Sequence, residues 1–106
     1  MTTLPAEKLD RIIERFDLIQ AELSSGTGGE AFVKLSREYA EIEPAARAAQ
    51  GLRNAYSERR AIAEMANETD RELAEMARAE QPLVEERIGK LEQELRLLLE
   101  ELFSIS

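Results

Sequence analysis

The chain has 106 residues, neither cysteine nor histidine, and a formal net charge of −8 at pH 7. Charged residues make up 34% of the sequence and aromatic residues only 5%, which favours a single domain of long, solvated helices sharing a narrow apolar seam. These values exclude disulfides, thiolate metal sites and histidine acid–base chemistry, and they argue against broad nucleic-acid binding because phosphates need a basic surface.

The first predicted helix covers about residues 5–24. Its apolar residues step alternately by three and four, which places them on one helix face: Leu9, Ile12, Phe16, Ile19 and Leu23. Pro5 suits the first helical turn, where its missing donor is harmless. The glycine-rich run from Ser24 to Gly29 then ends the helix.

The second predicted helix is long, about residues 30–67, and it contains Pro44. A proline in a helix interior cannot donate to the carbonyl four residues before it, at a cost of about 3 kcal/mol. A loop at this point would normally reset the apolar phase, yet Ile42 and Ala46 keep the helical step of four across the proline. This continuity favours one helix bent at Pro44 over a break.

Two further helices are predicted, at about residues 70–80 and 83–103. Thr69 and Glu72 form a capping-box pattern at the start of the first, with Asp70 as an alternative cap. Pro82 then either kinks this helix or begins the next one. The last helix has the most regular apolar spacing in the chain, typical of a coiled-coil seam: Val84, Ile88, Leu91, Leu95, Leu98 and Leu102.

These elements predict an all-α fold that forms one domain over residues 1–106. The two long helices form an elongated, antiparallel coiled-coil hairpin, and the shorter N-terminal helix packs alongside to complete the bundle. The connection between the long helices is short enough to force neighbouring helices to run antiparallel. No stretch of the sequence has the alternating pattern of a strand.

We predict no catalytic, cofactor-binding or metal-binding residue. Paired carboxylates such as Glu85–Glu86 and Glu100–Glu101 are typical of solvated helix faces, since a helical di-metal site would normally include histidine. The glycine run before residue 30 lacks the preceding strand and the lysine of a phosphate loop. No segment approaches the roughly 20 apolar residues of a membrane span, so we expect no membrane partner and a cytoplasmic location.

Basic residues gather in the second half of the long helix, within an otherwise acidic protein. Between residues 45 and 62 a single acidic residue, Glu58, opposes four arginines: Arg47, Arg53, Arg59 and Arg60. Such a run is either ordinary solvated charge or a contact to RNA or to an acidic partner.

The C-terminal end carries more apolar residues than one seam can bury. This surplus predicts a further contact surface, either with a neighbouring domain or with a second copy of the chain. The residues that would form such a homodimer are Leu98, Leu99, Leu102 and Phe103.

Three segments of the chain carry a family resemblance. They are KLSREYAEIEP (Lys34 to Pro44), TDRELAEMARAE (Thr69 to Glu80) and IGKLEQELRLLLE (Ile88 to Glu100). In order and with matching gaps, they are similar to KLSKEYxELEPI, DPELREMAREE and LEELEEELKRLLL of the bacterial class I peptide chain release factors that read UAA and UAG. The resemblance covers about residues 4–100 and identifies the chain with the N-terminal helical domain of that family.

The resemblance implies a part in translation termination as a domain without catalytic residues. The family's codon-reading Pro-x-Thr and its Gly-Gly-Gln tripeptide lie in later domains, and neither occurs in these 106 residues. We therefore expect no stop-codon reading or peptide release from this chain alone.

In that family the N-terminal domain contacts the large ribosomal subunit near the stalk base and the GTPase-associated centre, and it communicates with the class II release factor GTPase. Local charge alone selects Arg53, Arg59 and Arg60, with Asn67 and Asp70 at the hairpin tip, as candidate contact residues. The alternative function is a coiled-coil oligomerisation module.

Overall fold

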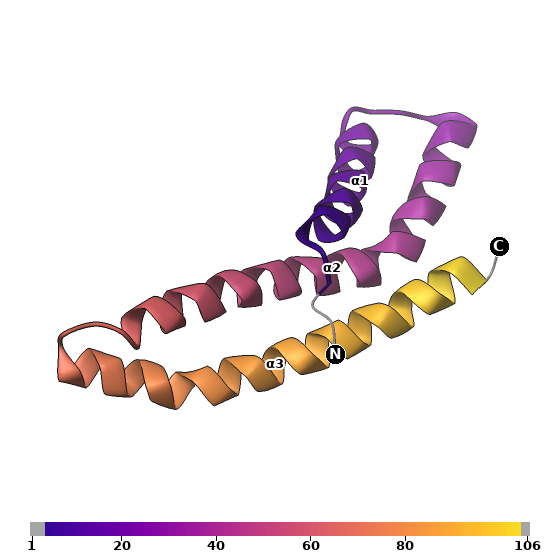
Figure 1. Ribbon diagram of the computed structural model, residues 1–106. Helices are drawn as coiled ribbons and strands as arrows, with labels where there is room; N and C mark the ends of the chain where they lie inside the picture. The colour runs from indigo at the N-terminus through magenta and orange to yellow at the C-terminus, as the bar shows by residue number, and fades with distance from the viewer. Residues whose placement is uncertain (1–3, 105–106) are drawn as a thin grey trace.

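The computed structural model describes residues 4–104, which form three α-helices and no strand. The helices are α1 (Ala6–Ser24), α2 (Gly29–Met65) and α3 (Arg71–Ser104). Figure 1 shows α2 and α3 as a long antiparallel hairpin, with α1 packed on α2. The molecule measures 60 × 30 × 18 Å and has a radius of gyration of 17.9 Å, against about 13 Å for a compact domain of this length. The predicted elongated all-α bundle is confirmed.

α2 is the central helix, because it packs against both of the others. Most of its buried residues are alanines, namely Ala45, Ala46, Ala48, Ala49 and Ala55, and the others are Leu52 and Ile62. Small side chains shorten the distance at which two helix axes can pack. The alanine-rich middle of α2 therefore lets α1 and α3 approach it closely on two sides.

Most of the larger core side chains come from the two outer helices. α1 buries Leu9, Ile13, Phe16 and Ile19. α3 buries Ala74, Ala77, Val84, Ile88 and Leu95. The predicted apolar face of α1 is thus confirmed at Leu9, Phe16 and Ile19, whereas Ile12 and Leu23 are only half-buried and Ile13 is buried instead.

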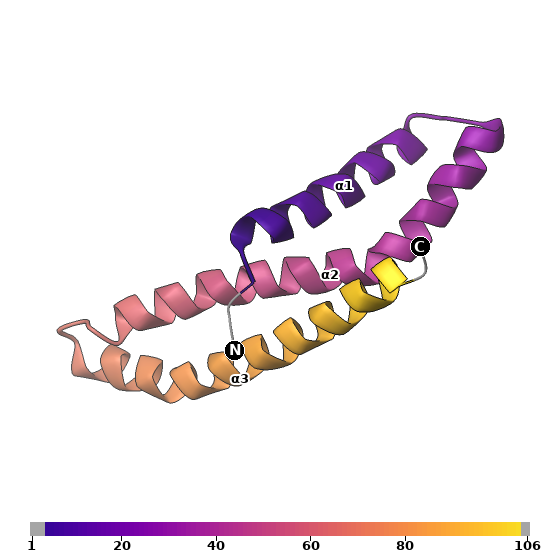
Figure 2. The same cartoon turned by 45° about the vertical axis from the view of Figure 1, so that its right-hand side comes forward.

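α2 continues through Pro44 and bends there, as Figures 1 and 2 show, so the prediction of a single bent helix is confirmed. Residues on both sides of the proline contact the same α1 side chain. The ring of Phe16 stacks on Tyr39 at 5.0 Å between centroids, and the guanidinium of Arg47 lies 5.1 Å from the centre of the Phe16 ring. Glu43 accepts a hydrogen bond from the Tyr39 hydroxyl (3.2 Å) and pairs with Arg47 (3.4 Å). α1 therefore holds the two arms of α2 at their bend.

The predicted division of the last segment into helices at about 70–80 and 83–103 is wrong, because α3 runs unbroken through Pro82. The buried positions Ala77, Val84 and Ile88 are spaced seven and four apart, so the face that packs on α2 keeps its phase across the proline. Pro82 itself is exposed. Packing against α2 offsets the lost backbone hydrogen bond and holds the helix together.

A chain of hydrogen bonds joins the residue before α1, the middle of α2 and the second half of α3. The backbone N–H of Leu4 donates to the Tyr56 hydroxyl (3.2 Å), which donates in turn to the carboxylate of Glu92 (2.5 Å). Glu92 is 6% exposed and is the single buried charged residue in the described part of the chain. The Tyr56–Glu92 bond therefore satisfies a carboxylate that the packing of α2 on α3 removes from water.

This environment raises the pKa of Tyr56 to about 12. Burial is the main cause, and the hydrogen bond to Glu92 adds to it together with the Glu92 charge. The N–H of Leu4 and the positive charge of Arg59 act in the opposite direction. The guanidinium of Arg59 lies 5.0 Å from the centre of the Tyr56 ring.

The substitution Tyr56→Phe should remove the donor and leave the Glu92 carboxylate buried without it. We expect the free energy of unfolding to fall by about 1–3 kcal/mol, measured by urea denaturation at pH 7. The double variant Tyr56→Phe/Glu92→Leu should recover most of this loss, because it leaves no buried carboxylate unpaired. Equal stability of the single variant and the wild type would contradict the role of the bond.

The raised pKa also predicts how stability depends on pH. Because the folded-state pKa of Tyr56 lies above the value near 10 of an exposed phenol, the protonated phenol stabilises the fold fully below pH 10. This contribution is lost as the pH rises from 10 to about 12. In that window the wild type should lose stability more steeply than Tyr56→Phe, measured by urea denaturation at each pH. Parallel curves would contradict the assignment.

Candidate interaction surface

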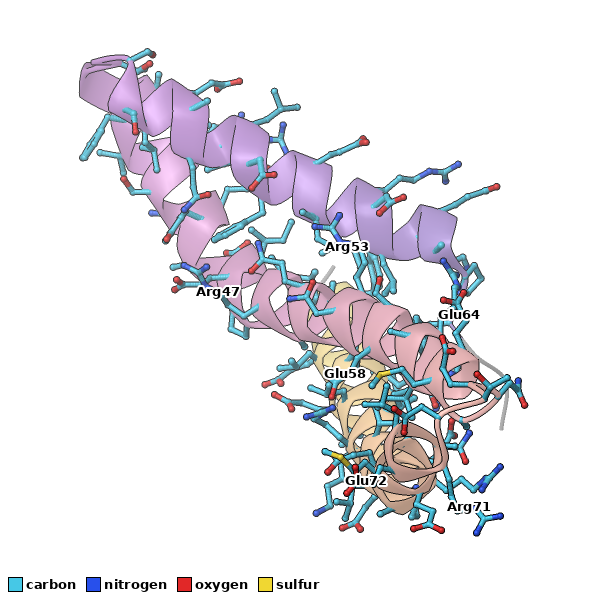
Figure 3. The ribbon with its side chains drawn as sticks, turned by 90° about the vertical axis from the view of Figure 1, so that its left-hand side faces the viewer. Arg47, Arg53, Glu58, Glu64, Arg71 and Glu72 are labelled. Carbon is cyan, nitrogen blue, oxygen red and sulfur yellow. The ribbon has the colours of Figure 1, made fainter. Side chains whose placement is uncertain are left out.

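The three arginines predicted as contact residues lie on α2, beyond its bend, and two of them are engaged within the molecule. Arg53 pairs with Asp10 of α1 at 3.3 Å and Arg59 pairs with Glu85 of α3 at 3.3 Å. Figure 3 shows Arg53 between α1 and α2. The two side chains thus brace α2 against different neighbours rather than forming one patch.

Both arginines keep part of their surface in water: their side chains are 49% and 36% exposed. Exposed ion pairs contribute about 0–1 kcal/mol, so a polyanion could compete for these guanidinium groups. Arg60 is exposed and makes no hydrogen bond or ion pair to any residue within 4–104. Of the predicted basic residues, Arg60 is therefore the one most available to a partner.

The two predicted contact residues at the hairpin tip also stabilise the turn. Asn67 donates from its side-chain amide to the carbonyl of Ala63 (3.3 Å), at the end of α2. Asp70 caps α3: its carboxylate accepts hydrogen bonds from the N–H groups of Glu72 (3.0 Å) and Leu73 (3.3 Å). Of the two caps that the sequence offered, the structure uses Asp70.

The C-terminal leucines are less available than the sequence suggested. Leu98 and Leu99 pack against the core and are half-buried, as is Leu102. Leu97 and Phe103 remain 58% and 70% exposed. The proposed dimer surface is thus partly used within the chain itself.

Sequence reasoning missed a different exposed apolar group, close to the hairpin tip. Its members are Met65 at the end of α2 and Leu73, Met76 and Leu83 on α3. The sequence spacing does indicate this group, because Leu73, Met76 and Leu83 lie three and seven residues apart and so share one helix face, beside the face that packs on α2.

Two classes of site find no support within residues 4–104. No group of three or more acidic side chains there is arranged to hold a metal ion. None of the three helices there is both long and apolar enough to cross a membrane.

Comparison with known proteins gives the family. Residues 12–102 match the PCRF domain, a span that takes in parts of all three helices. The chain belongs to the PCRF domain family. The resemblance to release factors seen in the sequence is therefore confirmed.

This chain is similar to peptide chain release factors over most of its length. It is 38% identical over 96 residues to peptide chain release factor 1 of Caulobacter vibrioides, 36% identical over 101 residues to that of Rhizobium rhizogenes and 31% identical over 101 residues to that of Bartonella tribocorum. These alignments cover 91–93% of this chain but only 26–28% of the relatives, so it spans about a quarter of their length. No solved structure is significantly similar to it.

The structural role of Asp70 can be separated from any role in binding. Asp70→Ala should lower the free energy of unfolding of the PCRF domain by about 1 kcal/mol, because it removes both capping hydrogen bonds. Glu68→Ala is the matched control, since it removes a nearby exposed carboxylate that caps no helix. Urea denaturation of both variants measures the difference, and equal losses would contradict the capping role.

Proposed function

We propose that the chain is the non-catalytic, ribosome-docking arm of a peptide chain release factor, acting in translation termination in the cytoplasm. The observation that carries this proposal is the PCRF match over residues 12–102, because it spans the bend, the hairpin and its tip. The names of the relatives, peptide chain release factor 1, support it.

The proposed docking site lies on the large ribosomal subunit near the stalk base, where the arm also communicates with the class II release factor GTPase. An elongated shape of 60 Å supports this role, since an arm must reach a surface at a distance from the domains that perform the chemistry. Neither the Pro-x-Thr nor the Gly-Gly-Gln tripeptide occurs in the 106 residues. Codon reading and peptide release are therefore assigned to other parts of such a factor.

The basic residues of α2 are the proposed contact with ribosomal RNA, and they are not equivalent. Reversing Arg53 or Arg59 would also place like charges beside Asp10 or Glu85, which would disturb packing as well as binding. Arg60 makes no such contact among the described residues. A variant at Arg60 therefore tests binding with the least effect on the fold. Asn67 and Asp70 are secondary candidates for a ribosome contact, because their side chains also stabilise the tip.

Arg60→Glu should weaken cosedimentation of the chain with purified large ribosomal subunits by up to about tenfold at low salt. If Arg60 contacts a phosphate, the slope of log affinity against log salt concentration should become shallower by about 0.9. The measurement is the bound fraction in the pellet across a salt series.

Arg11→Glu is the matched control, because Arg11 is also exposed but lies on α1, and the change in net charge is identical. We expect this control to bind as the wild type does. A wild type that fails to pellet above background would overturn the docking proposal. Equal loss in both variants would overturn the Arg60 contact and leave only a general charge effect.

The second candidate, a coiled-coil oligomerisation module, has support in the exposure of Leu97 and Phe103. The half-burial of Leu98, Leu99 and Leu102 argues against it, because side chains packed within the chain are not available to a second copy. Sedimentation velocity should give a monomer whose sedimentation coefficient does not change with concentration. A concentration-dependent dimer abolished by Phe103→Ser would favour this candidate instead.

A further inference from the structure

Four large apolar side chains near the hairpin tip form an exposed surface without an assigned role. Met76 and Leu83 of α3 are 64% and 59% exposed, and Leu73 of α3 and Met65 of α2 are 40% and 39% exposed. We call these four residues the tip stripe. Four such side chains close together exceed the scattered single hydrophobic residues that are normal on a surface.

The ion pairs of the hairpin place Met65 on the same side as the α3 residues. Glu58 of α2 pairs with Arg87 of α3 at 2.7 Å, so these two positions lie level and on one side. Met65 is two helical turns after Glu58, and Glu80 is two turns before Arg87, so Met65 lies level with Glu80. Figure 3 shows Glu58 and Glu72 on one side of the hairpin, and Glu64 and Arg71 on the other.

The spacing within α3 matches a helix-packing seam that has no partner in the described chain. Leu73, Met76 and Leu83 lie three and seven residues apart, which is the spacing of core positions in a coiled coil, and the charged Glu80 lies between Met76 and Leu83. α2 occupies the adjacent face of α3, through Ala77, Val84 and Ile88. The tip stripe is thus a second seam beside the first, and a seam of this spacing fits another helix.

The charge around the tip stripe indicates what kind of partner helix would bind there. Glu72 and Glu80 stand four residues before and after Met76, so an acidic group flanks the central methionine on each side. Residues 64–80 hold six acidic residues and two basic ones, and one of the two, Arg78, donates to the Ala66 carbonyl (3.2 Å). This acidic edge repels RNA, and it also repels the same edge of a second copy of the chain.

We infer that the tip stripe binds a basic, amphipathic helix of a partner protein, with its apolar residues in the seam and its lysines or arginines against Glu72 and Glu80. Exposed methionine suits such a surface, because its flexible side chain adapts to the shape of an apolar partner. This inference deepens the proposed function, and it rests on that function only for the place where the partner protein would be found, the ribosome. The arginines of α2 would then bind RNA, and the tip stripe would bind protein.

The test is a titration of the full 106-residue chain, labelled with ¹³C at the methionine methyl groups, with a synthetic helical peptide of lysine and leucine. Its leucines are spaced three and four apart, and a peptide of the same composition with scrambled order is the control. We expect the methyl resonances of Met65 and Met76 to shift saturably with the patterned peptide and much less with the scrambled one. A short RNA hairpin should shift neither methyl group.

Matched variants separate the seam from general charge attraction. Leu73→Ser/Leu83→Ser should weaken peptide binding at least about tenfold. Leu97→Ser should not, although Leu97 lies on the same helix and is as exposed as Leu83. Glu72→Gln/Glu80→Gln should also weaken binding, and Glu14→Gln/Asp17→Asn on α1 is its control of equal charge. Circular dichroism confirms that each variant is helical.

The inference is overturned if the scrambled peptide binds equally well, if the seam variant binds within twofold of the wild type, or if the RNA hairpin shifts the same methyl groups. The inference would also be overturned if these methyl groups were covered by a second copy of the chain, seen as shifts that depend on the concentration of the chain alone. Because the titration contains no ribosome, its failure leaves the cosedimentation result standing. Failed cosedimentation beside a successful titration would instead overturn the docking proposal alone.

Discussion

The fold depends on one constraint: α2 has to pack against a helix on each of two sides along the same stretch of chain. An ordinary amphipathic helix has one apolar stripe, and large side chains on a second face would hold the neighbouring helices apart. The alanines between residues 45 and 55 meet this constraint, since they allow close approach and carry a strong helix propensity. The bulk of the core then comes from α1 and α3, which supply side chains such as Phe16 and Leu95.

The same constraint explains why a proline is tolerated inside the central helix. Pro44 costs α2 a backbone hydrogen bond, and the helix survives because both of its arms are held from outside. α1 provides this support through Phe16, which contacts Tyr39 before the bend and Arg47 after it. Further support comes from the Arg15–Glu38 ion pair, which joins α1 to the first arm of α2. The angle of the arm is therefore a property of tertiary packing as well as of the proline, and it would relax if α1 were removed.

Sequence patterns predicted the helix content, the hairpin and the bend at Pro44, because each depends on local spacing. The same criterion of continuous apolar phase holds at Pro82 as well, where Ala77 and Val84 keep the register. The burial of Glu92 could not be predicted, because a carboxylate four residues from an arginine is typical of a solvated ion pair. Its contact with Tyr56 depends on the register of α2 on α3. The ion pair of Arg59 with Glu85 depends on the same register, and the ion pair of Arg53 with Asp10 depends on how α1 packs on α2. Local charge could therefore select the basic stretch but not rank the residues within it.

The charge pattern of the whole chain limits how such an arm can bind. With a net charge of −8, the chain as a whole repels RNA, and salt screens this repulsion beyond about one Debye length, which is about 8 Å at physiological ionic strength. Any contact of Arg60 with RNA is then effective only at short range, after something else has positioned the arm. The tip stripe would act differently under our proposal, because its acidic edge would attract basic protein segments within this range and its exposed apolar residues would hold them on contact. We therefore propose that the tip would engage first and set the register, and that the arginines of α2 would add affinity only when the arm lies in the correct orientation.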